Sequence, residues 1–134
     1  MRATTLYVFS GKFGSRAEAC HYSEPQWEPE PPETASDEEY AHWEDNNPTH
    51  KLRANLPGYL DSDFIETING SRRHDYLAGM LIDPSDIDEI IVAEPEGANV
   101  FILISEEALG GSPLKSKPVS TQELKFCGRY QCRL

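Results

Sequence analysis

Three closely spaced carboxylates near the middle of the chain are the residues best suited to do chemistry. Asp61, Asp63 and Glu66 lie within residues 58–68 (GYLDSDFIETI), and clustered carboxylates are what Mg²⁺ binding or a general acid–base step would use. On a helix, Asp63 and Glu66 would share a face, and Asp61 would be the N-cap or the residue before it. The pattern leaves three uses open: capping with a solvated face, contact with a partner, and metal binding or catalysis.

The histidines and cysteines show no spacing that is typical of a metal site. The four histidines are His21, His42, His50 and His74. No two of them lie four residues apart, as two ligands on one helix would. A zinc site built from Cys127, Cys132 and one histidine is a weaker alternative to solvated or partly buried imidazoles. We therefore expect no metal ion and no other cofactor.

Motifs of well-known enzyme classes are absent from the sequence. Residues 11–15 (GKFGS) are rich in glycine, but they lack the G-x-x-x-x-G-K-[ST] frame that binds phosphates, so we expect a turn there. No nucleophile elbow, H-E-x-x-H motif or dinucleotide-binding fingerprint occurs. The sequence thus predicts a protein that is not an enzyme, and a carboxylate-based enzyme remains as an alternative.

The most informative feature is an acidic stretch from residue 17 to residue 50. It holds ten carboxylates, no lysine and no arginine, together with Trp27, Tyr40 and Trp43. Carboxylates alone are typical of a solvated segment, whereas large aromatic side chains supply the contact area of a tight interface. The net charge of −11 argues against binding to nucleic acid or to an anionic membrane. It favours a basic protein partner, because opposite charge steers association.

The expected partner-binding residues combine this stretch with the central carboxylates. They are Trp27, Asp37, Glu38, Glu39, Tyr40, Trp43, Glu44, Asp45, Asp61, Asp63 and Glu66. The carboxylates would steer the partner and set its register, and the aromatic rings would provide buried contact. A structural alternative is that the helix-start acids complement the helix dipole while Tyr40 and Trp43 face the core. That alternative leaves the glutamates at positions 24, 28, 30 and 33 without an explanation.

The first half of the chain has clear signals for the elements that position these residues. Residues 4–10 (TTLYVFS) predict a first strand, and the capping-box spacing of Ser15 and Glu18 predicts a helix to about residue 22. Ser36 and Glu39 repeat that spacing and predict a helix over residues 37–45. The proline-rich acidic loop over residues 25–35 is expected to be an ordered loop or a mobile arm, and Trp27 favours order.

The second half predicts two more helices and three strands. Residues 60–68 and 71–81 are expected as helices, the second with Tyr76, Leu77, Met80 and Leu81 toward the core. Residues 89–93 and 100–104 predict a β-hairpin, with the second strand covered on both faces. Residues 123–131 predict a half-exposed last strand with Leu124, Phe126 and Tyr130 on one side.

These elements predict one α+β domain over residues 1–134, with about four mainly antiparallel strands packed by three or four helices. Residues 111–134 are expected to form a basic C-terminal strand region. The three cysteines are odd in number, which suits free thiols in a reducing cytoplasm. No run of about 18 apolar residues and no signal peptide is evident, so we expect neither export nor membrane anchoring.

Several short motifs over about the first 110 residues occur in a characteristic order. After the first strand come Gly11, Phe13, Ser15, Glu18 and Tyr22. An acidic aromatic helix follows, and then residues 60–66 (LDSDFIE). In these features the chain resembles a family of bacterial immunity proteins from polymorphic-toxin, or secreted-effector, systems. The proline-rich insertion at 25–32 and the basic segment from residue 115 onward depart from the family's pattern.

The resemblance implies a small cytoplasmic protein that binds and neutralises a cognate toxin domain, many such toxins being nucleases. It places Asp61, Asp63, Phe64 and Glu66 in an acidic aromatic motif of the family. We expect a monomer or weak dimer with a basic toxin as its partner. Alternatives are an effector chaperone or adaptor that binds the toxin without neutralising it, and an acidic mimic of nucleic acid.

Overall fold

An antiparallel sheet of four strands in the order β2-β3-β1-β4 forms the centre of the molecule. Its strands are β1 (Ala3–Gly11), β2 (Ile65–Asn69), β3 (Val100–Ser105) and β4 (Lys125–Arg133). The computed structural model describes residues 3–56, 58, 60–110 and 117–133. It confirms the predicted α+β fold with a four-stranded antiparallel sheet. Within the predicted C-terminal region, residues 111–116 and 134 lie outside the described residues.

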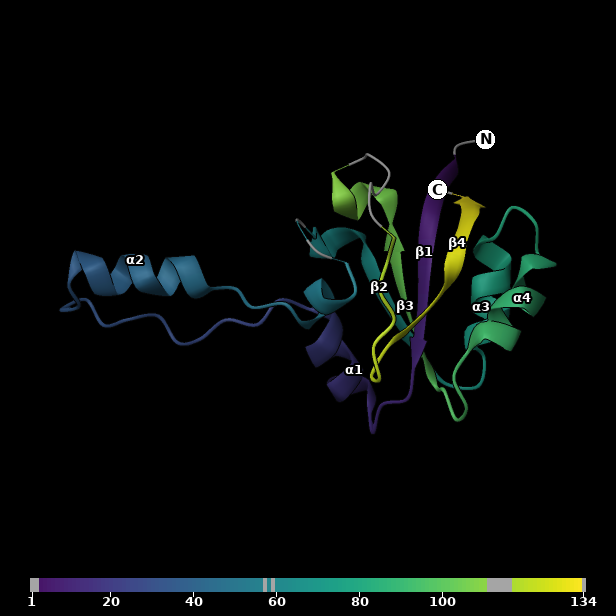
Figure 1. Ribbon diagram of the computed structural model, residues 1–134, viewed down its shortest axis with the longest axis horizontal. Helices are drawn as coiled ribbons and strands as arrows, with labels where there is room; N and C mark the ends of the chain where they lie inside the picture. The colour runs from purple at the N-terminus through teal and green to yellow at the C-terminus, as the bar shows by residue number, and fades with distance from the viewer. Residues whose placement is uncertain (1–2, 57, 59, 111–116, 134) are drawn as a thin grey trace.

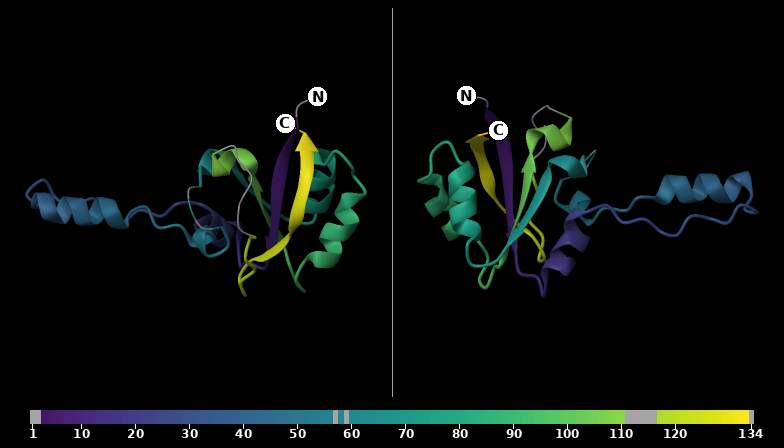
Figure 2. Two further views of the ribbon diagram at one scale, coloured as in Figure 1. Left: turned by 45° about the horizontal axis from the view of Figure 1, so that its top comes forward. Right: turned by 180° about the vertical axis from the view of Figure 1, so that it is seen from behind.

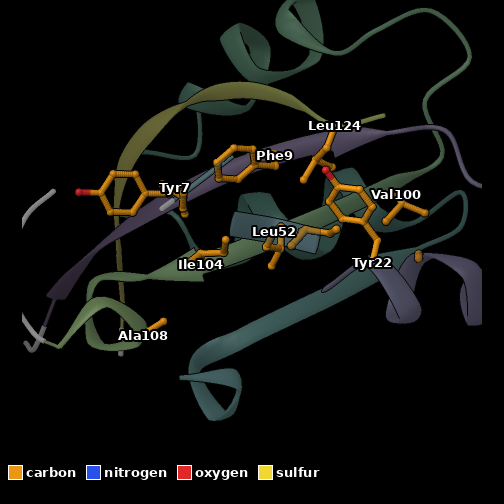
Figure 3. Packing of buried hydrophobic residues seen from close by; sticks show 11 residues of the cluster. Tyr7, Phe9, Tyr22, Leu52, Val100, Ile104, Ala108 and Leu124 are labelled. Carbon is orange, nitrogen blue, oxygen red and sulfur yellow. The ribbon is translucent and has the colours of Figure 1, made fainter. Parts of the chain in front are cut away.

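The two central strands, β1 and β3, carry the core on both faces of the sheet. Tyr7 and Phe9 of β1 point to one face, where they pack with Ile102 and Ile104 of β3 (Figure 3). The alternate residues Leu6, Val8, Phe101 and Leu103 pack on the opposite face. Because side chains of a strand alternate in direction, this pattern requires covering layers on both sides. The prediction that residues 100–104 are covered on both faces is confirmed.

Helices supply the two covering layers. The helix α1 (Arg16–Ser23) and the short 3-10 helix η1 (Lys51–Ala54) cover one face. The helices α3 (Arg73–Met80) and α4 (Asp86–Ala93) cover the other (Figure 1). The predicted cap of α1 is confirmed, because Ser15 Oγ accepts a hydrogen bond from Glu18 N at 3.2 Å. Among the helices of the described residues, none is long and apolar enough to cross a membrane.

The helix predicted over residues 60–68 is wrong. Only a 3-10 turn, η2 (Ser62–Phe64), forms there, and the chain then continues as β2. The β-branched residues Ile65, Thr67 and Ile68 favour an extended strand once β3 is available as a neighbour. Glu66 pairs with Leu103 of β3 in this strand, so Asp63 and Glu66 do not share a helix face.

The strand predicted over residues 89–93 is also wrong, and with it the hairpin to β3. These residues form the end of α4. Ile87, Ile90 and Ala93 recur every three residues and pack against the sheet, which is helical spacing. The acidic first turn of α4, with Asp86, Asp88 and Glu89, further favours the helix through its dipole.

Two smaller differences concern side-chain direction. The register of β4 against β1 shifts between Val8 and Phe9, so Phe126 packs on one face and Tyr130 on the other instead of sharing a side. An extra residue in one strand reverses the alternation beyond it. In α3, Leu77 is buried as predicted, whereas Tyr76 is 49% exposed and does not belong to the core.

The remaining helix, α2 (Asp37–Asn46), does not pack on the sheet. Together with the chain on either side of it, α2 projects from the body as an arm in every view (Figure 2). We define the arm as residues 24–49 and the body as the other described residues. The arm leaves the body at the end of α1 and returns to it just before η1.

Candidate functional site

The arm has no hydrophobic core of its own in contact with the sheet. No residue from 24 to 49 is buried, and α2 has no buried position along its length. An isolated helix of ten residues is marginal in water, so local contacts must hold the arm together. Its order depends on its root, its cap and its aromatic rings.

The root of the arm is closed by backbone hydrogen bonds. Gln26 N donates to Thr49 O at 2.7 Å, and Thr49 N donates to Gln26 O at 2.8 Å. One step further out, Glu28 N donates to Asn47 Oδ1 at 2.8 Å, and Asn47 Nδ2 donates to Trp43 O at 2.9 Å. These bonds bring the outgoing proline-rich loop beside the returning chain, and the choice between an ordered loop and a mobile arm stays a prediction.

Three aromatic rings contact one another along the arm, one pair tilted and the other edge-to-face. The ring centroids of Trp27 and Trp43 are 5.8 Å apart, and those of Tyr40 and Trp43 are also 5.8 Å apart. Trp43 Nε1 donates to Glu28 O at 3.1 Å, so the indole ties α2 to the proline-rich loop. The alternative that Tyr40 and Trp43 face the core is therefore wrong. They form an aromatic cluster with Trp27, whose side chain is 60% exposed.

The charge of the arm is of one sign. Residues 24–49 contain nine carboxylates, no lysine and no arginine. Among the described residues the ion pairs join Arg73 and His74 to Glu94 on the body, so no salt bridge there neutralises a carboxylate of the arm. Part of this charge has a local role: Ser36 Oγ accepts from Glu39 N at 3.1 Å, and the first-turn acids stabilise the start of α2.

The structure brings together the aromatic residues of the predicted site but not the whole predicted set. Trp27, Tyr40 and Trp43 form one cluster, and α2 presents its acids next to that cluster. They are Asp37, Glu38, Glu39, Glu44 and Asp45. Asp61, Asp63 and Glu66 instead lie on the body, from which α2 projects away (Figure 1): Asp61 is the N-cap of η2, Asp63 lies in η2 and Glu66 lies in β2.

The three central carboxylates have local contacts in place of a shared ligand site. Asp61 caps η2, because its side chain accepts from Asp63 N at 3.0 Å. Glu66 Oε2 accepts from Tyr76 Oη at 2.8 Å, and this hydrogen bond raises the pKa of Tyr76. Within the residues that the structure describes, no three His, Cys, Asp or Glu side chains are arranged to hold a metal ion.

Sequence reasoning missed a groove beside β2. Its volume is about 670 Å³, and its walls come from α1, from β2, from Tyr76 and from the first residues of the arm. The contributing residues include Arg16, Cys20, Glu24, Pro25 and Glu66. The groove forms because β2 is a strand at the edge of the sheet. The sequence pattern predicted a helix for these residues and therefore could not predict the groove.

A buried ionic cluster on the body was missed as well. Glu94, at the end of α4, accepts from Ser10 Oγ at 2.8 Å and lies 2.6 Å from His74 Nε2. Arg73 Nη2 lies 3.3 Å from its Oε1. The carboxylate of Glu94 contacts all three of the other side chains, and Ser10 is fully buried. The cluster therefore joins α3, α4 and β1 and has a structural role. No local sequence pattern predicts this cluster, because Ser10, the Arg73–His74 pair and Glu94 are far apart in the chain.

Comparisons with protein-family models, with curated proteins and with solved structures find no match to this chain. The resemblance to bacterial immunity proteins therefore stays a prediction. The two candidate functional surfaces of the molecule are the acidic aromatic arm and the groove beside β2.

Proposed function

We propose that this protein binds and neutralises a cognate antibacterial toxin domain with a basic surface, using the arm as its main contact. The observation that carries the proposal is an acidic arm that lies outside the body, has no buried residue and holds three aromatic rings in mutual contact. Aromatic side chains that lie together in one exposed patch are typical of interaction sites, whereas single exposed apolar residues are common on any surface. The protein acts by occupying its partner and needs no catalytic step.

A nuclease is the toxin class that best fits such an arm. A nuclease must carry lysine and arginine side chains to bind phosphate groups. An arm with nine carboxylates and no base can lie against that basic surface, while Trp27 and Trp43 exclude water from the centre of the contact. The arm is narrow because it consists of one helix and one loop (Figure 2), a shape suited to a cleft.

The charge of the arm makes a prediction about kinetics. Exposed charges steer a basic partner from a distance, and salt screens that attraction beyond about 8 Å at physiological ionic strength. The association rate should therefore fall as salt is raised, while the dissociation rate, which reflects the aromatic contacts, should change less. The three cysteines are free thiols, which suits action in a reducing cytoplasm.

The proposal is tested with a variant of the arm that combines Trp43→Ala, Glu38→Lys and Glu39→Lys. The toxin is identified as the protein that co-purifies with this chain and as the product of the adjacent gene. The variant should lose toxin binding in calorimetry and should no longer block toxin activity. It should keep the urea midpoint of the original protein, because no residue of the arm is buried in the core.

A matched control separates a specific surface from general charge repulsion. Val92→Ala, Asp88→Lys and Glu96→Lys alter exposed positions of the body with the same change in net charge. This control should bind the toxin with nearly the affinity of the original protein. Equal affinity of the arm variant and the original protein would remove the arm from the account.

The same assay decides between neutralisation and the two alternative functions. A chaperone or adaptor would bind the toxin protein through the arm yet leave the activity of the isolated toxic domain unchanged. An acidic mimic of nucleic acid would bind several unrelated basic proteins with similar affinity. Immunity requires one tightly bound partner and loss of its activity.

A further inference from the structure

The strand β2 lies at an edge of the sheet. Its five residues pair with β3 on one side, and no strand lies on its other side in the part of the chain that the structure describes. Gly70 N, directly after β2, donates to Asn99 O. Because antiparallel pairs alternate, the backbone groups of Glu66 and Ile68 face β3, whereas those of Thr67 and Asn69 face outward.

A side chain already occupies one position of this open edge. Arg16 Nη1 donates to Thr67 O at 3.1 Å and to Asn69 Oδ1 at 3.1 Å. The carbonyl of Thr67 therefore points away from β3, as the alternation requires. Arg16 is exposed, so its long side chain can leave the edge without uncovering the core.

The groove of about 670 Å³ runs along this edge. Arg16 and Cys20 of α1 stand on one side of β2, and Tyr76 of α3 stands on the other. An extended chain in the groove would lie beside the outward-facing backbone groups of β2. The five residues of β2 span about 16 Å at ~3.3 Å per residue. Two exposed carboxylates, Glu24 and Glu66, line the same groove.

We propose that an extended segment of the partner adds to β2 as a fifth strand, with lysine or arginine side chains reaching Glu24 and Glu66. The basic character of the segment rests on the proposed function. Backbone hydrogen bonds to Thr67 and Asn69 supply affinity, and the side chains along the groove supply specificity. Since Glu24 begins the arm, one partner can contact the arm and the groove together.

A second copy of this chain is a poor occupant of the groove. Two-fold pairing of β2 with β2 would bring the same surface of both copies together. Such pairing would gather the Glu24 and Glu66 carboxylates of both copies along one seam, and each copy carries a net charge of −11. Like charges at close range oppose such pairing, whereas a basic strand is attracted.

Cys20 provides a built-in reporter for the groove. It lines the groove and is partly exposed, whereas Cys127 and Cys132 are buried. Burial raises the pKa of Cys127 to about 11 and also raises that of Cys132. A maleimide reagent reacts with the thiolate, so it should label Cys20 first, and Cys20→Ser should remove that fast phase.

The probe is a capped eight-residue peptide in which lysine and valine alternate, and the control is the same peptide with glutamate for each lysine. The lysine peptide at millimolar concentration should slow labelling of Cys20 about tenfold, and the glutamate peptide should not. In the same sample, amide exchange at Thr67 and Asn69 should slow about tenfold. Glu66 and Ile68, which face β3, should exchange slowly with or without peptide.

Unchanged labelling and unchanged exchange at Thr67 and Asn69 with the lysine peptide would overturn the strand-addition proposal. Protection of these amides without peptide, growing with protein concentration, would identify a second copy as occupant and would overturn it too. The triple variant of the arm should respond to the peptide as the original protein does. Toxin binding could depend on the arm while amide exchange in β2 stays fast. That result would leave the proposed function intact and would reject strand addition at the groove.

Discussion

The arm and the body use similar residues in opposite ways. In the body, Phe101 of β3 is fully buried, and the helices around it are fixed by packing. In the arm, Trp27 is 60% exposed and its neighbours on α2 are not buried either. Both regions have Ser-capped helices, at Ser15 for α1 and Ser36 for α2. The two helices differ in burial: α1 buries residues against the sheet, and α2 buries none.

Because of this difference, we expect the body to determine the stability of the protein and the arm to determine partner binding. All twelve lysines and arginines lie outside residues 17–50, so the arm can hold a charge of one sign without disturbing ion pairs of the body. The free energy of folding comes from apolar burial on the sheet. A sequence change in the arm should therefore affect binding and leave folding almost unchanged, and a change in the core should do the reverse.

Truncating an aromatic side chain in each region is the strongest way to break this comparison. Phe101→Ala should lower the free energy of unfolding by about 3–5 kcal/mol, because it removes a buried ring and leaves a cavity. Trp43→Ala should lower it by less than about 1 kcal/mol. Urea denaturation followed by far-UV circular dichroism measures both values, and similar losses would mean that the arm belongs to the cooperative core.

Removing a carboxylate in each region gives the next largest contrast. Glu94→Ala should cost about 3 kcal/mol, because the side chain of Glu94 is 7% exposed and its loss leaves Arg73 without its counter-charge. Glu38→Ala, on the exposed first turn of α2, should change the free energy of unfolding by less than about 0.5 kcal/mol. Thermal unfolding of the two variants side by side would contradict the account if Glu94→Ala proved as stable as Glu38→Ala.

The two helix caps provide a pair with identical chemistry. Ser15→Ala removes the cap of α1 and should cost about 1 kcal/mol of global stability. Ser36→Ala removes the same kind of hydrogen bond from α2, but it should act on the local order of the arm alone. Amide exchange in α2 should then become faster while the urea midpoint stays in place. A shift of that midpoint as large as the one caused by Ser15→Ala would argue that α2 folds with the sheet.

The free energy of unfolding should depend slightly on pH because of His50, which lies where the arm meets the body. His50 is buried directly after the root residue Thr49, and burial and then the nearby Arg53 lower its pKa. The unfolded chain therefore binds a proton at higher pH than the folded protein does, so stability is full above about pH 6.5 and falls below it. His50→Leu should flatten this dependence between pH 7.5 and pH 5, and an unchanged slope would assign it to other groups.

Local signals in the sequence predicted the elements that depend on local contacts. The caps at Ser15 and Ser36 located α1 and α2, and the β-branched runs located β1 and β3. The mistakes fell where a distant neighbour decides the outcome. Residues 65–69 became a strand because β3 lies beside them, and residues 89–93 became a helix because Ile87 and Ile90 meet the sheet.

The candidate site was predictable in composition but not in arrangement. The base-free charge and the tryptophans could be read from the sequence, and they fall on one arm. The sequence could not tell whether Tyr40 and Trp43 face the core or the proline-rich loop, since both surfaces reward aromatic contact. It also joined Asp61 and Glu66 to the acidic stretch, although both lie on the body.

Excising the arm shows whether the arm is the surface that binds the partner. Gln26 and Thr49 are hydrogen-bonded to each other at its root, so residues 27–48 can be replaced by Asn-Gly, a two-residue turn that closes such a pair. The binding of the proposed toxin partner to this shortened protein is then measured by calorimetry, with the urea midpoint of the shortened protein as the check on folding. The account predicts a folded body with binding lost or weakened at least about a hundredfold. A folded body that binds the toxin with undiminished affinity would contradict it.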